Sequence, residues 1–133
     1  MNKKLYYLLN FTWGIPMTLV GYIACLVLIG FGKCPTRHGG CLCFEVGENW
    51  GGVSLGMVII VSKGASDSVK NHEFGHSIQN SMFGVLMPFI VAIPSAVRYW
   101  YRRGQDPSTL PPYDAVWFEG QATELGNKYI LNW

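Results

Sequence analysis

Two histidines one helical turn apart are the residues of this sequence best suited to chemistry. Residues 72–76 read HEFGH, and side chains four positions apart on a helix project from the same face. His72 and His76 are therefore expected to bind one Zn²⁺, with Glu73 beside them as the general base for a zinc-activated water. The alternative is a helix whose histidines are only buried or hydrated.

A catalytic zinc site usually has three protein ligands and one open position, so a third ligand must come from elsewhere in the chain. The other histidine and the carboxylates that follow the motif are His38, Asp106, Asp114, Glu119 and Glu124. Asp106 falls in a proline-rich loop, and Asp114 is better placed as the N-cap of a final helix at residues 115–130. Glu119 and Glu124 lie on that helix about 140° apart around its axis, so only one of them can face the metal.

Glu119 is the preferred third ligand because Thr123 lies one turn further along the same helix face. A hydroxyl at that position can hydrogen-bond a metal ligand and orient it. The sequence thus predicts Zn²⁺ held by His72, His76 and Glu119, with Glu73 as the catalytic base and Thr123 supporting a ligand.

Short strands and a capped helix are expected before the motif. Residues 40–47 and 53–62 are rich in apolar and β-branched side chains and flank the turn-forming residues 48–52, which predicts a β-hairpin. The second run is apolar on both faces, so helices or lipid are expected to cover it, and its edge is expected to bind the backbone of a substrate. Ser66 or Asp67 can cap the helix that carries the motif.

The first apolar stretch predicts a membrane anchor. Residues 5–32 contain no charged side chain, and as one helix they would be roughly 42 Å long, whereas a bilayer core needs only about 20 apolar residues. We therefore predict a transmembrane helix that Pro16 either kinks or divides. A cleaved signal peptide is disfavoured because its apolar region usually has only about 7–15 residues and ends at an A-x-A site.

A second uncharged stretch covers residues 82–97 and contains Pro88 and Pro94. As a helix it would span about 24 Å, which is less than a bilayer core of about 30 Å. Three interpretations remain open: a buried core helix, an interfacial or re-entrant helix, and a short second span. Since the metal ligands lie on both sides of this stretch in the chain, it has to fold back. The arginine and aromatic side chains of residues 98–103 are typical of a membrane interface.

Composition excludes several other classes of protein. Half of the residues are hydrophobic and 14% are charged, which excludes a disordered chain. A net charge of +2 from 10 basic and 8 acidic side chains is too small for a nucleic-acid-binding protein, which carries a clustered basic face. Most basic residues follow the first apolar stretch, which favours a cytoplasmic site but leaves the side of the membrane open. The spacing of Cys34, Cys41 and Cys43 around His38 favours ordinary thiols over a second zinc site.

The motif and the later glutamate resemble the gluzincin zinc metallopeptidases, which carry HExxH on one helix and a glutamate ligand on a later one. The sequence EGQAT at residues 119–123 is similar to the E-x-x-A-D pattern of membrane peptidases of the HtpX and Ste24 type. Glu119 matches the ligand and Ala122 the alanine, whereas Thr123 stands where the pattern has aspartate. The whole chain also resembles a group of small bacterial membrane proteins with an HExxH motif. This resemblance implies a zinc peptidase but no particular substrate.

The sequence therefore predicts an α+β protein that is a membrane-bound zinc metallopeptidase of a bacterial cell membrane. Residues 1–32 are the expected transmembrane segment, and residues 33–133 the expected minimal zincin-like catalytic unit, including the apolar segment 82–97. The expected partners are a peptide or protein substrate and membrane lipid. Two alternatives remain: a zinc hydrolase acting on another amide or ester, and a non-catalytic membrane protein whose zinc is structural or binds a partner. A fourth protein ligand or a wholly covered hairpin edge would favour the non-catalytic protein.

Overall fold

Helices and strands alternate in blocks along the chain. A computed structural model describes residues 1–131 and residue 133. The helices α1 (Lys3–Phe11) and α2 (Ile15–Gly30) precede the strands β1 (Thr36–His38), β2 (Cys41–Glu45), β3 (Gly52–Leu55) and β4 (Val58–Val61). The helices α3 (Asp67–Phe83), α4 (Ile93–Arg103) and α5 (Trp117–Ile130) follow. Short 3₁₀ or π-helical turns between them are η1 (Gly84–Leu86), η2 (Pro88–Ala92), η3 (Pro107–Thr109) and η4 (Tyr113–Ala115). The predicted α+β class is confirmed.

The strands form one four-stranded sheet in the order β1-β2-β4-β3. The pairs β1–β2 and β3–β4 are antiparallel, whereas β2 and β4 run parallel. The prediction of a single hairpin formed by residues 40–47 and 53–62 is therefore wrong. The second run is itself a hairpin, and it turns at Gly56, whose φ of +64° suits a residue without a side chain.

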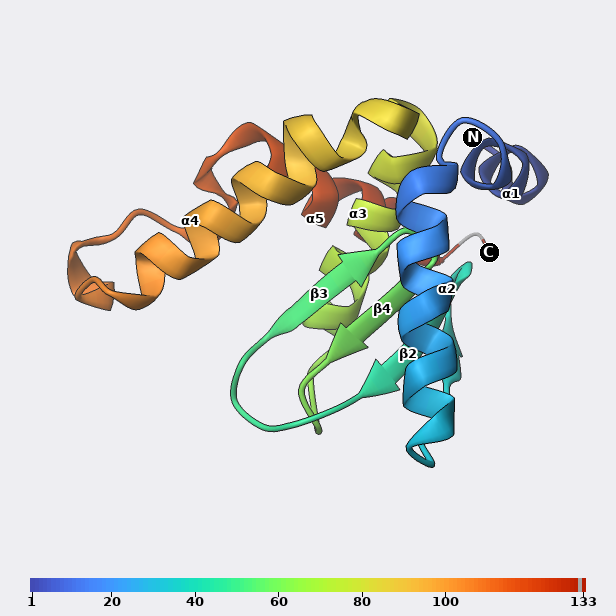
Figure 1. The fold of residues 1–133 in the computed structure, drawn as a ribbon. Helices are drawn as coiled ribbons and strands as arrows, with labels where there is room; N and C mark the ends of the chain where they lie inside the picture. The colour runs from blue at the N-terminus through green and yellow to red at the C-terminus, as the bar shows by residue number, and fades with distance from the viewer. Residues whose placement is uncertain (132) are drawn as a thin grey trace.

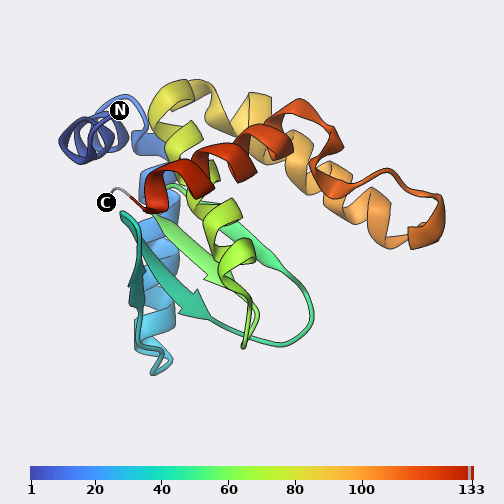
Figure 2. The same ribbon diagram turned by 180° about the vertical axis from the view of Figure 1, so that it is seen from behind.

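Helices cover both faces of the sheet and give three layers (Figures 1 and 2). On one face, Val58 packs with Cys25 of α2. On the other face, Ile59 packs in one cluster with Phe74 of α3, and α5 lies alongside α3 (Figure 2). Successive side chains of β4 thus pack against helices on opposite faces of the sheet, which explains why this run is apolar on both faces. The expectation that helices cover it is confirmed.

The first apolar stretch is not one helix. Helix α1 ends at Phe11 and α2 begins at Ile15, with Pro16 in its first turn and a bend of 90° between the two. Proline is favoured in the first turn of a helix, where its missing N–H costs no hydrogen bond, so Pro16 favours the start of a new helix here. In the described part of the chain, no single helix has the length and apolar character needed to cross a membrane. The predicted single transmembrane helix is therefore corrected to a bent pair.

Buried polar side chains join this bent pair to α3. The amide of Asn80 donates to Asn10 Oδ1 at 2.6 Å, and Thr18 Oγ1 donates to the carbonyl of Asn10 at 2.8 Å. At the bend, the indole N–H of Trp13 donates to the carbonyl of Ser81 at 3.0 Å. Because buried polar groups are costly unless paired, these bonds hold α1 and α2 in register with the helix that carries HEFGH.

The second apolar stretch is also bent, by 118° between the α3–η1 segment and the η2–α4 segment. Met87 and Val91 are buried in a cluster with Phe118 of α5. Phe89 and Ile93 point outward and are 69% and 54% exposed. The stretch therefore packs one face on the core and leaves the other exposed, which combines features of the core and interfacial interpretations.

Candidate metal centre

The helix α3 presents both motif histidines to the interior. Ser66 accepts a hydrogen bond from the Val69 N–H at 3.3 Å, so Ser66 rather than Asp67 is the N-cap of this helix. The side chain of His72 is 13% exposed and that of His76 is 7% exposed. The helix spacing places the two rings next to each other, with centroids 4.8 Å apart.

Two glycines let α5 approach α3 closely enough to bring in a third ligand. A Cβ atom on Gly75 would lie 1.7 Å from the carbonyl oxygen of Ala122. A Cβ atom on Gly126 would lie 1.8 Å from the carbonyl oxygen of Asn71. The two backbones are thus in direct contact, and Glu119 of α5 reaches the histidines from the neighbouring helix.

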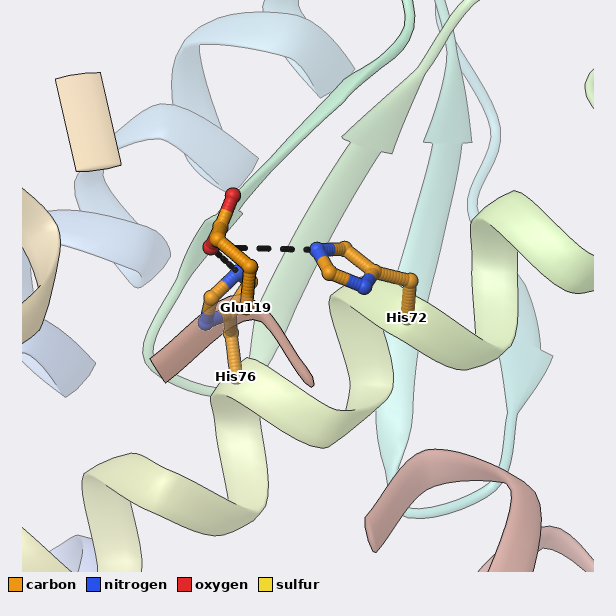
Figure 3. Close-up of side chains that lie close together, drawn as sticks. All are labelled: His72, His76 and Glu119. Atoms are coloured by element: carbon orange, nitrogen blue, oxygen red, sulfur yellow. Dashed lines mark ion pairs between the residues drawn. The ribbon is translucent and has the colours of Figure 1, made fainter. Parts of the chain in front are cut away.

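The three predicted ligands meet at one point. Glu119 Oε1 lies 2.9 Å from His76 Nε2 and 3.9 Å from His72 Nε2, and Figure 3 shows the two rings and the carboxylate pointing toward one another. Ligand atoms about 2 Å from a tetrahedral ion lie about 3.3 Å apart, between the two measured distances. Glu124, the other glutamate of this helix, is exposed. The structure therefore brings His72, His76 and Glu119 together as a group that could hold a metal ion.

Unsatisfied atoms at this point fit a metal ion. His72 Nε2 and Glu119 Oε2 are buried and have no hydrogen-bond partner. Buried polar atoms are rarely left without a partner, so each such atom needs an explanation. Two imidazole nitrogens and a carboxylate are a donor set that Zn²⁺ accepts, and a cation between them would give His72 Nε2 a partner.

Thr123 contacts the first histidine and is itself held by Asp114. Thr123 Oγ1 donates to Asp114 Oδ2 at 2.8 Å, so it accepts a hydrogen bond from His72 Nδ1 at 2.7 Å. This leaves His72 Nε2 with a lone pair for the metal. The predicted N-cap role of Asp114 is wrong: α5 begins only at Trp117, and Val116 stands at the cap position without a side-chain hydrogen bond.

Gln79 accepts a hydrogen bond from the second histidine, as Thr123 does from the first. Its amide N–H groups donate to the carbonyl of Phe118 at 2.8 Å and to Gln121 Oε1 at 3.0 Å. Its oxygen therefore faces His76 Nδ1, at 2.7 Å, and accepts from it. Sequence reasoning missed this residue, although its position three residues after His76 on the same helix is a signal that could have found it.

Glu73 lies beside the ligands in a nearly closed environment. It is 7% exposed, and burial raises the pKa of its carboxyl to about 7, although the charge of His76 acts in the opposite direction. A carboxyl with a pKa near the working pH can both accept and return a proton. Its position and its raised pKa would allow it to exchange a proton next to a potential metal site.

The pKa values of the ligands reflect their mutual contacts. Burial lowers the pKa of His72, which favours the neutral imidazole that binds metals. Burial also acts to lower the pKa of His76, but its hydrogen bond with Glu119 and the carboxylate charges raise it above the usual value. The burial of Glu119 acts to raise its pKa, but the same hydrogen bond lowers it overall. Glu119 is thus available as an ionised ligand.

Tyr113 lies beside the candidate metal centre. Its ring lies 6.0 Å from that of His72, and its pKa is raised by burial and by Glu119. The guanidinium groups of Arg98 and Arg102 lie over its ring at 4.7 and 5.2 Å. Because these contacts hold the phenol beside Glu119, Tyr113 is a candidate hydrogen-bond donor to a reacting oxygen.

His38 and Tyr129, which could in principle donate to a reacting oxygen as well, are engaged elsewhere. His38 Nε2 lies 2.7 Å from Asn71 Oδ1, and Tyr129 accepts a hydrogen bond from the N-terminal amine at 3.1 Å.

The cysteines stand apart from this site. Cys34 is exposed, whereas Cys41 and Cys43 are buried in the sheet, and none of them is in a disulfide. Burial raises the pKa of the Cys41 thiol to about 11, so it is a poor nucleophile and metal ligand at neutral pH. Among the described residues, no potential metal-binding group includes a cysteine.

Comparisons with protein-family models, with curated proteins and with solved structures found no match to this chain.

Proposed function

We propose that this protein is a membrane-bound zinc metallopeptidase. The observation that carries the proposal is the convergence of His72, His76 and Glu119 from two helices, with the buried carboxyl of Glu73 beside them. Two histidines, a glutamate and an adjacent acid–base carboxyl are the parts that metal-assisted hydrolysis of a peptide bond requires.

Each residue has a distinct task in this mechanism. When bound, zinc supplies the Lewis acidity that polarises a carbonyl group and acidifies water. Glu73 accepts a proton from the attacking water and returns it to the leaving amine. Tyr113 donates a hydrogen bond to the oxygen on which charge develops. The bonds from Thr123 and Gln79 keep both imidazoles in the tautomer that leaves Nε2 for the metal.

Two observations favour an enzyme over a structural zinc protein. Among the described residues, the group that could hold the ion contains three side chains rather than four, which would leave a position for water and substrate. The strand β3 is one of the two edge strands of the sheet, and a cavity runs along it to Glu73 and His76. An extended peptide can therefore pair with this edge and reach the metal centre.

Exposed apolar side chains support the membrane part of the proposal. On α2, Leu19, Ile23 and Leu26 are 54%, 63% and 71% exposed. On the η2–α4 segment, Phe89 and Ile93 are exposed as well. Large exposed apolar surfaces mark contacts with membranes or other proteins. Arginine and tryptophan at the end of α4 are suited to the polar boundary of a bilayer.

Metal analysis combined with peptide hydrolysis tests the proposal. Purified protein is expected to contain about one zinc per chain and to cleave members of a peptide library. Glu73→Gln should retain the zinc and the fold but lose about 10²–10⁴-fold in turnover, because only the proton transfer is removed. Asp67→Asn, at the exposed start of the same helix, is a matched control that should keep full activity. Unchanged turnover of a verified substrate by Glu73→Gln would refute the mechanism.

A further inference from the structure

We infer that Ser95 of α4 is a positioning residue for the metal centre, and that its hydroxyl group holds the Glu119 carboxylate in the orientation in which it can bind a metal ion. This inference rests on the metal centre of the proposed function and adds a side chain from a third helix to it. The contact that carries it is a hydrogen bond of 3.2 Å, which Ser95 Oγ donates to Glu119 Oε1.

The hydrogen bond reaches the carboxylate oxygen that faces the histidines. Glu119 Oε1 lies 2.9 Å from His76 Nε2 and 3.9 Å from His72 Nε2. A carboxylate oxygen has more than one lone pair, so Oε1 can accept the Ser95 proton and still offer a lone pair to a metal ion. The bond also fixes which oxygen faces the histidines, because rotation of the carboxylate would break it.

Glu119 is the ligand that needs such support. The two imidazoles are already oriented by their hydrogen bonds with Thr123 and Gln79. Glu119 is completely buried, but glutamate is a long side chain with large rotamer freedom when nothing holds it. Carboxylates that bind metals are themselves hydrogen-bonded, and loss of such a partner lowers metal affinity. With Ser95 included, each of the three ligands has a supporting side chain.

Packing of the segment before α4 against the start of α5 brings the two side chains together. Val91 of η2 is buried in one cluster with Phe118, the residue before Glu119. Ser95 lies four positions after Val91, and residues at this spacing share one face of a helix. The face that buries Val91 beside Phe118 therefore also presents Ser95 to the carboxylate of the next residue.

Tyr113 also contacts Glu119, but its proton is needed elsewhere in the proposed mechanism. Burial and a hydrogen bond with Glu119 raise the pKa of the Tyr113 phenol. A phenol has a single O–H to donate, and the mechanism uses it for the oxygen on which charge develops. Ser95 can stay on the carboxylate while Tyr113 donates to the reacting oxygen.

Zinc titration of hydroxyl variants tests the inference. Ser95→Ala should weaken zinc binding by roughly 10–100-fold, measured in competition with a chelator. Ser95→Thr keeps the hydroxyl and should retain most of the affinity, and Ser108→Ala, which removes a hydroxyl at an exposed position, should bind zinc like wild type. In a protein that already carries Glu119→Ala, Ser95→Ala should have no further effect, because the serine acts through that carboxylate.

The visible absorption of the Co²⁺-loaded protein separates an effect on the ligand from a general loss of structure, because these bands depend on the coordination geometry. The bands should shift in Ser95→Ala and keep their wild-type positions in Ser95→Thr and Ser108→Ala. Wild-type zinc affinity and cobalt bands in Ser95→Ala would overturn the inference even if KM rises, because Ser95 also lines the cavity along β3 and would then act only on substrate. Loss of the folded state in Ser95→Ala, seen by circular dichroism, would overturn it as well.

The same measurements distinguish this inference from the peptidase proposal. Zinc binding with the expected pattern, but no hydrolysis of any library peptide by wild type, would reject the peptidase and leave the role of Ser95 standing. Hydrolysis by wild type with equal zinc affinity in Ser95→Ala would do the opposite. Absence of zinc binding by the wild-type protein would overturn both.

Discussion

The contact between α3 and α5 buries polar side chains, whereas the outer faces of α2 and α4 expose apolar ones. In the first region, Gln79 and Glu119 are completely buried. In the second region, Leu26 is 71% exposed and Val97 is 64% exposed. Each region thus reverses the usual distribution of side chains in a soluble domain.

Under the proposed function, each region has a partner outside the chain. Buried polar groups are tolerated where each has a partner, and a bound cation would give one to His72 Nε2, which has no hydrogen-bond partner among the described residues. Exposed apolar side chains contribute a favourable free energy only when a lipid or protein surface removes them from water. We therefore expect changes in the polar region to affect metal binding and stability, and changes in the apolar region to affect membrane association.

The largest effect is expected from removing the third ligand. Glu119→Ala should weaken zinc binding by more than the roughly 10–100-fold that loss of a ligand's hydrogen-bond partner costs, because one of three anchors is gone. Glu124→Ala, on the same helix but exposed, should leave the affinity nearly unchanged. Zinc titration in competition with a chelator measures both. The ligand assignment fails if Glu124→Ala strips the metal and Glu119→Ala does not.

A smaller effect is expected from separating the two helices. Gly126→Ala places a methyl group against the carbonyl of Asn71, and overpacking of this kind costs about 1–3 kcal/mol of unfolding free energy. Gly30→Ala is the control, because no atom lies within 4 Å of its added Cβ. Urea denaturation of both variants measures the difference. Equal stability of the two would mean that the close approach of α3 and α5 is not required.

Removing the support of either imidazole should weaken zinc binding by roughly 10–100-fold. Gln79→Leu and Thr123→Val delete the acceptors of His76 Nδ1 and His72 Nδ1, respectively. Thr123→Ser keeps the hydroxyl and should restore the affinity. Gln105→Leu makes the same amide-to-apolar change at an exposed position and is the control for Gln79→Leu. If Thr123→Ser binds zinc as weakly as Thr123→Val, the contact acts through packing rather than through the hydrogen bond.

The smallest effect on stability is expected on the apolar face. Leu26→Ser should change the unfolding free energy by no more than about 0.5 kcal/mol, as is usual for exposed positions. It should nevertheless reduce binding to phosphatidylglycerol vesicles, because an apolar side chain that the lipid would cover is lost. Cys25→Ser, at the adjacent buried position, should instead lower the unfolding free energy and leave vesicle binding unchanged. Unchanged vesicle binding by Leu26→Ser would argue against a membrane role for this face.

Local spacing in the sequence was enough to place the centre of the site. The HEFGH spacing puts His72 and His76 on one face because helix geometry relates residues four apart wherever the helix lies. Ser66 was one of two candidate caps for the same reason, since a cap bonds to a residue three positions on. Helix geometry alone showed that only one of Glu119 and Glu124 can face the metal, and Thr123 on the same face favoured Glu119.

The tertiary structure decided what depends on contacts between distant segments. Packing sets three features that local spacing left open: the parallel pairing of β2 with β4, the break of the apolar stretch between Phe11 and Ile15, and the engagement of Asp114 with Thr123 rather than with a helix end. The sequence allowed each of these residues more than one favourable local state, and only the surrounding fold selects one of them. The cavity along β3 is likewise a property of the assembled layers, because its walls come from α2, the sheet, α3 and α4 together.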